Sequence, residues 1–224
     1  LRDGQWSDWI NVEFRMGAMK LQKVRAITRA LLKKEGREVA LYVSPLNFDP
    51  STPLYPISYP KEYSAELCEA IGLYHTRGMP HDTQAVNDEV LSDDAFLEQC
   101  RLITDESEKM LFHELARFRK GVLFAYFEES DIIQHMFWRA IDPEHPLYKA
   151  EGTARYRDVI PQCYERCDAI LGRARAALGK QGAIVVLSDH GFAPFRKAVH
   201  LNAILRDLGF LALKNGEKTS PEFF

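Results

Sequence analysis

The sequence predicts an α/β protein in which buried parallel strands alternate with helices. Short continuous apolar runs at Val122–Phe127 and Ile184–Ser188 have the composition of strands that are buried on both faces. Segments with helical spacing lie before, between and after these two runs. Such an alternation implies a parallel sheet whose strands are joined by helical crossovers.

The N-terminal part of the chain departs from this pattern and predicts a small β-rich insertion. Gln5–Phe14 alternates polar and apolar residues, as a half-buried strand does. Lys20–Lys33 and Glu38–Val43 predict an antiparallel hairpin that turns at Glu35-Gly36-Arg37. A helix over Leu21–Lys34 stays open as an alternative, because Ala and Leu favour helix.

Prolines recur at positions 45, 50, 53, 56 and 60. Because proline interrupts both helices and central strands, this stretch must run as an extended loop. We therefore expect two parts: residues 1–62 as a β-hairpin and Pro-rich insertion, and residues 63–224 as the main α/β part.

Helical signals follow the loop. Ser92 has the character of an N-cap, and apolar residues keep helical spacing from there to about Arg119. The other expected helices are Tyr63–Leu73, Ser130–Trp138, Thr153–Leu178 and Leu201–Asp207, and a Pro-rich turn at Asp142–Pro146 separates the second from the third.

Composition sets limits on function. With 224 residues, of which 46% are apolar and 27% charged, the chain is long enough for a full hydrophobic core. A net charge of -3, with Lys and Arg scattered among acids, argues against nucleic-acid binding. No apolar run approaches the roughly 20 residues that span a bilayer. The cysteines lack C-x-x-C or zinc-ribbon spacing and predict reduced structural thiols: Cys68, Cys100, Cys163 and Cys167.

The two ends of the chain suggest an internal piece of a longer protein. It begins with Leu1 rather than Met, and it stops at two aromatic residues, Phe223 and Phe224. We therefore expect an incomplete fold.

Both predicted central strands end in an acid and an imidazole. Asp189 and His190 follow the second run directly, while Asp131 and His135 stand four apart at the start of the helix after the first run. Carboxylate oxygen and imidazole nitrogen suit Zn²⁺ or Mn²⁺, and the carboxyl ends of parallel strands meet at one edge of a sheet. Two such corners predict a two-metal site. A helix-capping Asp131 and a plain Asp-His-Gly turn stay open as structural alternatives.

The order of these motifs resembles a known family. Tyr126-Phe127-Glu128-Glu129-Ser130-Asp131 and His135-Met136-Phe137-Trp138-Arg139 come first, followed by Asp142-Pro143-Glu144-His145-Pro146 and then Ser188-Asp189-His190-Gly191-Phe192. Together they resemble the type I phosphodiesterase/nucleotide pyrophosphatase family of the alkaline phosphatase superfamily. The resemblance is firm over about residues 121–213 and looser before them.

The resemblance implies an alkaline-phosphatase-like parallel sheet with helices on both faces, and residues 63–224 would form part of that catalytic core. It also implies two divalent metal ions, zinc in preference to manganese, with Asp131 and His135 binding one and Asp189 and His190 the other. The reaction implied is hydrolysis of a phosphate ester, a diester or pyrophosphate in preference to a monoester, phosphonate or sulfate ester. Small-molecule or nucleotide-like substrates are expected.

No catalytic nucleophile is identifiable in the sequence. The Thr or Ser that attacks phosphorus in the family, and a further Asp, have no match here, so we expect them outside these 224 residues and expect this piece alone to be inactive. A non-catalytic interaction module on the same fold is the alternative.

An arginine and four histidines outside these pairs have other expected places. Arg196 follows the second metal motif and is a candidate phosphate contact, because a guanidinium can bind phosphate through two hydrogen bonds. His200 is expected at a helix start rather than on a metal. His145 is expected in an exposed turn, and His75 and His81 in a solvated loop.

Overall fold

The computed structural model describes residues 2–17, 22–150, 154–194 and 196–214. The chain forms two compact units, one of Leu1–Phe137 with Asp158–Leu187 and the other of Trp138–Arg157 with Ser188–Phe224. The boundary expected at residue 62 lies inside the first unit and stays a prediction.

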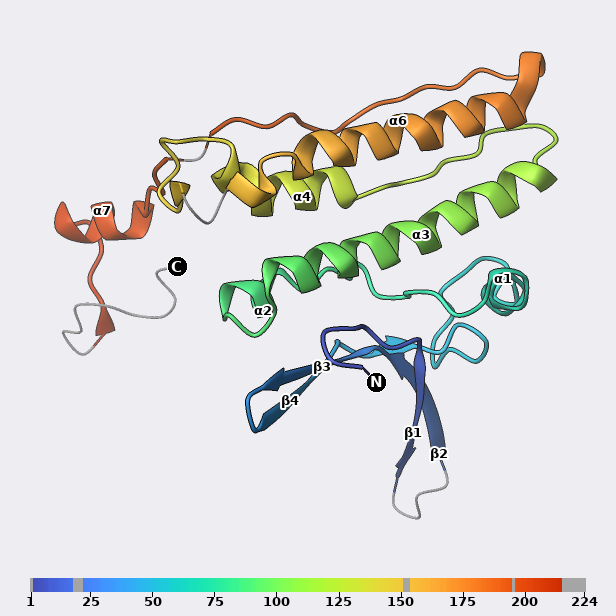
Figure 1. Ribbon diagram of the computed structural model, residues 1–224, viewed down its shortest axis with the longest axis horizontal. Coiled ribbons are helices and arrows are strands. Elements are labelled where there is room, and N and C mark those ends of the chain that lie inside the picture. The colour runs from blue at the N-terminus through green and yellow to red at the C-terminus, as the bar shows by residue number, and fades with distance from the viewer. Residues whose placement is uncertain (1, 18–21, 151–153, 195, 215–224) are drawn as a thin grey trace. The chain divides into compact units, whose positions relative to one another are not determined.

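The N-terminal part is β-rich, as the sequence predicts (Figure 1). Strands β1 (Ile10–Met16), β2 (Gln22–Thr28) and β5 (Asn47–Phe48) form an antiparallel sheet in the order β1-β2-β5. Strands β3 (Ala30–Glu35) and β4 (Glu38–Val43) form the expected hairpin, which turns at Gly36 with a φ of 62°. That left-handed backbone favours glycine over residues with a Cβ.

The strand expected over residues 20–33 is in fact two strands. Its first half, β2, pairs with β1 from Ile10 opposite Thr28 to Met16 opposite Gln22, and only β3 pairs with β4. The chain bends between them at Arg29, whose amide donates to the hydroxyl of Ser44 at 3.0 Å. The helical alternative for this segment is wrong, because backbone pairing with β1 and β4 takes precedence over the helix propensity of Ala and Leu.

Helices α1 (Tyr63–Ile71) and α3 (Asp93–Arg117) lie where the sequence predicts them. Ser92 caps α3, its hydroxyl accepting a hydrogen bond from the Ala95 amide at 3.3 Å. A short helix, α2 (Thr83–Asn87), was not expected from the sequence and is capped by Asp82.

The core of the first unit forms where three helices pack together. Helix α3 contacts α6 (Val159–Leu178), which in turn contacts α4 (Glu129–Phe137), as Figure 1 shows. Phe96 and Phe137 are almost fully buried and their rings stack 6.5 Å apart. Helix α6 begins later than residue 153; a 3₁₀ turn at Ala154–Tyr156 precedes it, and residues 151–153 lie outside the described ranges.

The two predicted central strands are not formed. Residues 122–128 and 183–187 carry no regular structure, and no described residue pairs with either run as a strand. Their side chains are exposed, with Val122 at 94%, Phe124 at 75% and Val185 at 79%. A buried strand needs hydrogen-bonding neighbours on both sides, and the described part of the chain supplies none. The described residues contain both helices and strands, so the mixed α/β class is confirmed. The described sheets, however, are small and antiparallel.

The second unit is built from short elements. Two 3₁₀ turns, Trp138–Ala140 and Ala154–Tyr156, are followed after residue 188 by helix α7 (Leu201–Asp207). The helix has the predicted bounds, and His200 stands at its N-cap as expected.

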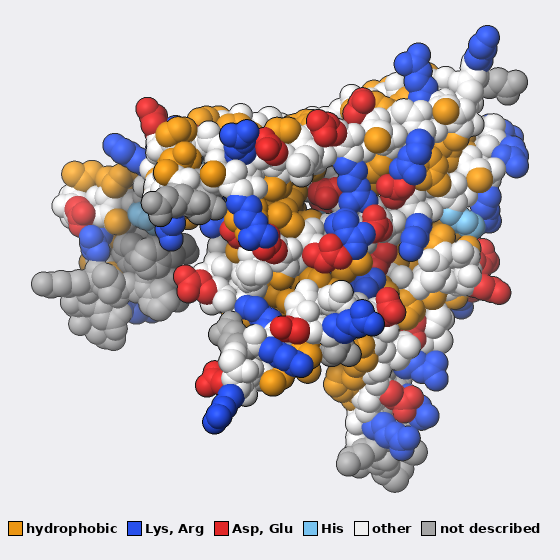
Figure 2. Space-filling model, viewed as in Figure 1, with side chains coloured by type: hydrophobic (Ala, Val, Ile, Leu, Met, Phe, Trp, Pro, Cys, Tyr) orange, Lys and Arg blue, Asp and Glu red, His pale blue; other side chains and the backbone are white. Residues whose placement is uncertain are grey.

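Two surface properties follow from the described residues. None of the described helices is both long and apolar enough to span a membrane. On the face in Figure 2, basic and acidic side chains are intermixed, as their scatter along the sequence predicts.

Candidate metal centre

Asp131 and His135 lie on the first two turns of α4. Four residues apart, they project from one face of the helix, and Asp131 Oδ1 lies 3.4 Å from His135 Nε2. The opposite face of α4 buries Ile132, Ile133 and Phe137, which fixes the helix to the core of the first unit. The His135 side chain is 60% exposed. The Asp131 side chain is 33% exposed, so the pair lies on an anchored helix with the imidazole open to solvent and the carboxylate partly buried.

The distance within this pair suits one tetrahedral metal ion. Two ligands, each about 2.1 Å from a zinc ion at a tetrahedral angle, lie about 3.4 Å apart. The Asp131–His135 separation agrees with this value, and one carboxylate with one imidazole is a donor set that zinc accepts. The two donors are thus compatible with one metal ion, and equally with an ion pair between the two side chains.

Asp189 and His190 belong to the second unit. His190 Nε2 lies 3.8 Å from Asp189 Oδ2, and both side chains are mostly exposed. Ser188 closes the turn by donating its hydroxyl hydrogen to the His190 carbonyl at 2.5 Å, and the His190 ring lies 5.5 Å from that of Phe192. The separation is wider than the 3.4 Å of the first pair.

Each acid–imidazole pair is a set of two donors within its own unit. Within the described ranges, no group of three or more His, Cys, Asp or Glu side chains is arranged to hold a metal ion. Each pair supplies two ligands, fewer than the three protein ligands that catalytic zinc sites commonly have. The joint dinuclear site therefore stays a prediction.

His81 lies next to the residues that precede α4. Its side chain is fully buried, and its Nδ1 lies 3.7 Å from Glu128 Oε1. Burial, together with the nearby His75, lowers the pKa of His81 to about 4, so the ring is neutral at pH 7. Burial also raises the pKa of Glu128. The expectation of a solvated His81 is wrong, because tertiary packing encloses the loop that carries it.

Glu106 of α3 is the centre of a buried polar network. Its Oε1 accepts hydrogen bonds from Trp9 Nε1 and Arg29 Nη2, each at 2.8 Å. Its Oε2 accepts from the His75 backbone amide at 2.8 Å and lies 2.9 Å from His75 Nδ1. Burial by itself would raise the pKa of Glu106, but the hydrogen bonds from His75 and Arg29 outweigh it and lower the pKa.

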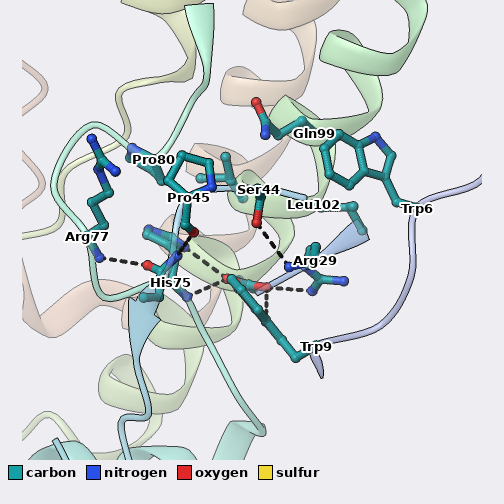
Figure 3. Close-up of a pocket in the computed structure, with 13 residues that line it drawn as sticks. Trp6, Trp9, Arg29, Ser44, Pro45, His75, Arg77, Pro80, Gln99 and Leu102 are labelled. Carbon is teal, nitrogen blue, oxygen red and sulfur yellow. Dashed lines mark hydrogen bonds and ion pairs between the residues drawn. The ribbon is translucent and has the colours of Figure 1, made fainter. Parts of the chain in front are cut away.

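The pocket beside this network is too small for a substrate (Figure 3). Arg29, His75 and Trp9 converge on the carboxylate from three different segments, and the free space is about 30 Å³. That volume holds one or two water molecules. The network therefore links the β-rich part to α3. His75 belongs to it, and so the expectation of a solvated His75 is also wrong.

The sequence offered little signal for this network. Glu106 stands in a predicted helix among several other charged residues, and nothing in its local pattern separates it from them. Its three partners come from positions 77, 97 and 31 residues away, so only the tertiary fold brings them together.

Arg196 has carboxylate partners in the second unit. Its Nη1 lies 2.6 Å from Asp142 Oδ2, and its Nη2 donates to Glu144 Oε2 at 3.3 Å. These two acids occupy the fork that a phosphate would use. His145 lies in the same turn, where its Nδ1 accepts a hydrogen bond from the Leu147 amide at 3.1 Å.

The comparisons with known proteins agree with this arrangement of motifs. The profile of the type I phosphodiesterase / nucleotide pyrophosphatase family matches residues 9–220, nearly the whole chain. Searches of curated proteins and of solved structures found no match. Because the match includes both acid–imidazole pairs and the β-rich region before them, the chain belongs to the type I phosphodiesterase / nucleotide pyrophosphatase family.

Proposed function

We propose that this chain carries the metal-binding part of a hydrolase that acts on small phosphodiesters or pyrophosphates. Membership of the family supports a phosphoric ester hydrolase. The observation that carries the proposal is the 3.4 Å separation of Asp131 and His135, which suits a single zinc ion.

The two pairs have matched roles in this proposal. Asp131 and His135 hold one divalent ion, and Asp189 and His190 hold the second, with zinc preferred over manganese. When bound there, two such ions would neutralise charge on a phosphate and would lower the pKa of metal-bound water to near neutrality.

The nucleophile is a Thr or Ser hydroxyl that we place outside these 224 residues. This hydroxyl attacks phosphorus and displaces the alcohol or phosphate leaving group, which gives a covalent phosphoryl- or nucleotidyl-enzyme. Water then hydrolyses this intermediate and frees the hydroxyl. The test therefore requires the protein made from the complete gene.

Metal content is the first measurement. We expect about two divalent ions per chain after removal of loosely bound metal. Fewer than one ion per chain would contradict the proposal and would favour the non-catalytic interaction module.

Hydrolysis of a chromogenic phosphodiester is the second measurement. The Asp189→Asn variant should lose turnover because a neutral amide binds zinc poorly, while Asp207→Asn, an exposed acid on α7, should keep wild-type turnover. Unchanged turnover of Asp189→Asn would rule out the role assigned to that residue.

A further inference from the structure

Two segments of the second unit are joined by an ion pair. Arg196 reaches Asp142 at 2.6 Å and Glu144 at 3.3 Å, and so spans the turn that contains both acids. The Asp142 side chain is only 14% exposed, which partly shields the pair from water. The Arg196 guanidinium beside Asp142 holds the pKa of that carboxyl below its usual range.

An aromatic contact joins the same two segments independently. The rings of Trp138 and Phe192 stack with centroids 6.2 Å apart and planes 18° from parallel. Phe192 also lies against the His190 ring. Segments 138–144 and 190–196 are therefore held together at both ends, by an aromatic stack at one end and by an ion pair at the other.

The positions of these contacts in the chain connect them with the metal motifs. Asp142 follows His135 by seven residues, and Arg196 follows His190 by six. The ion pair thus joins the segments that directly follow the two acid–imidazole pairs.

We propose that Arg196 is a positioning residue, which holds the Asp189–His190 segment to the turn at Asp142 so that the second metal pair keeps a fixed place. The inference rests on the proposed function, since the task of the segment is to hold a metal ion. It gives Arg196 a role other than direct contact with phosphate. A guanidinium suits this role because its planar fork can meet two acids at once, which an ammonium group cannot do with the same geometry.

Metal affinity and steady-state kinetics test the proposal in the protein from the complete gene. Arg196→Met removes the fork. Asp142→Asn removes the charge and keeps an oxygen for the Glu144 amide, which donates to Asp142 Oδ1 at 3.1 Å. Each variant should weaken retention of one zinc ion against a chelator about tenfold, as loss of a residue that supports a metal ligand typically does. In both variants kcat should fall while KM stays unchanged.

A double variant distinguishes a shared joint from two separate effects. If Arg196 and Asp142 act together, the double variant Arg196→Met with Asp142→Asn should bind zinc as tightly as whichever single variant binds it more weakly. Its loss of affinity should not be the sum of the two single losses. Reversing the pair, as Arg196→Asp with Asp142→Arg, should restore part of the affinity. The control is Arg101→Met, which removes an exposed ion pair on α3 and should bind zinc as the wild type does.

Two results would overturn the inference. Wild-type zinc affinity in both single variants would show that the joint does not support the metal pair. A raised KM and weaker inhibition by inorganic phosphate in Arg196→Met, with Asp142→Asn unaffected, would show that Arg196 contacts substrate instead.

Hydrogen exchange separates this inference from the proposed function, because it needs no metal. The His145 amide donates to the Asp142 carbonyl at 2.9 Å, and the Tyr148 amide donates to the His145 carbonyl at 2.9 Å. Exchange of these two amides is measured in metal-free protein. Arg196→Met should lose protection at these amides. Unchanged protection of these amides in Arg196→Met would refute the link between Arg196 and this turn. A metal analysis that finds no bound metal in the wild-type protein would refute only the proposed function.

Discussion

Glu106 and His75 are joined twice, since one carboxylate oxygen accepts the His75 backbone amide at 2.8 Å and lies 2.9 Å from its ring Nδ1. The other oxygen binds Trp9 and Arg29, so a single buried carboxylate connects the first strand region, the bend at Arg29 and the loop after α1 to α3. This network positions the loop that continues to His81. The Nδ1 of His81 lies 3.7 Å from Oε1 of Glu128, which directly precedes the helix of Asp131 and His135.

Glu106→Gln should strongly destabilise the first unit. The amide cannot balance the charge of Arg29, whose side chain is only 15% exposed, and its NH₂ group would face other donors. Breaking a buried ion pair in this way costs about 3 kcal/mol. Urea unfolding measures the change. Glu98→Gln on the same helix, which breaks an exposed pair with Arg101, should cost less than about 1 kcal/mol.

The stability of the protein should fall as the pH drops from about 6.5 to about 4. Folding lowers the pKa of His81 from 6.5 to about 4, so the unfolded chain binds more protons over this range. The loss amounts to roughly 3 kcal/mol, at about 1.4 kcal/mol per pKa unit. Glu128 and Glu129 oppose it, because their pKa values are raised by burial.

His81→Leu isolates the contribution of the histidine. Within the described ranges neither ring nitrogen of His81 has a hydrogen-bond partner, so leucine removes the titration without breaking a bond. Unfolding free energies measured from pH 4 to pH 7 should show a flatter profile for the variant. Parallel profiles for the two proteins would mean that His81 is not the titrating group.

Phe96→Ala should cost 3–5 kcal/mol, as truncation of a fully buried aromatic side chain typically does. Phe96 is fully buried and stacks on Phe137, the last residue of α4, so its loss leaves a cavity directly beneath the helix that carries Asp131 and His135. Chemical unfolding checks this value. Tyr164→Ala, at a 54% exposed position on α6, should change stability by less than about 1 kcal/mol.

Arg166→Met should loosen the packing of α6 on α3. Arg166 Nη2 lies 2.7 Å from Asp105 Oδ1, and Nη1 lies 3.9 Å from Glu129 Oε1, so one guanidinium joins α3, α4 and α6. Its side chain is 24% exposed, and we expect a loss of about 1–2 kcal/mol that becomes smaller at high salt. Thermal unfolding at low and high salt tests both parts. An effect independent of salt would indicate lost packing rather than lost charge.

The sequence by itself determined those features that depend on neighbours along the chain. Ser92 marked the start of α3, Gly36 marked the hairpin turn, and the spacing of Asp131 and His135 placed both on one helical face. Local backbone preferences and side-chain periodicity decide such features, so they can be read without the fold. The family, too, was recognisable from the order of its motifs.

Only the tertiary structure decided the features that depend on distant partners. The runs at 122–127 and 184–188 have the composition of buried strands, yet they form none, because strand formation requires neighbours that the described chain does not provide. Likewise, His81 is buried, Glu106 is ionised in the interior and Arg196 is paired with Asp142, because contacts across long sequence separations set their surroundings. Composition specifies what a side chain can do, whereas packing determines which groups it meets.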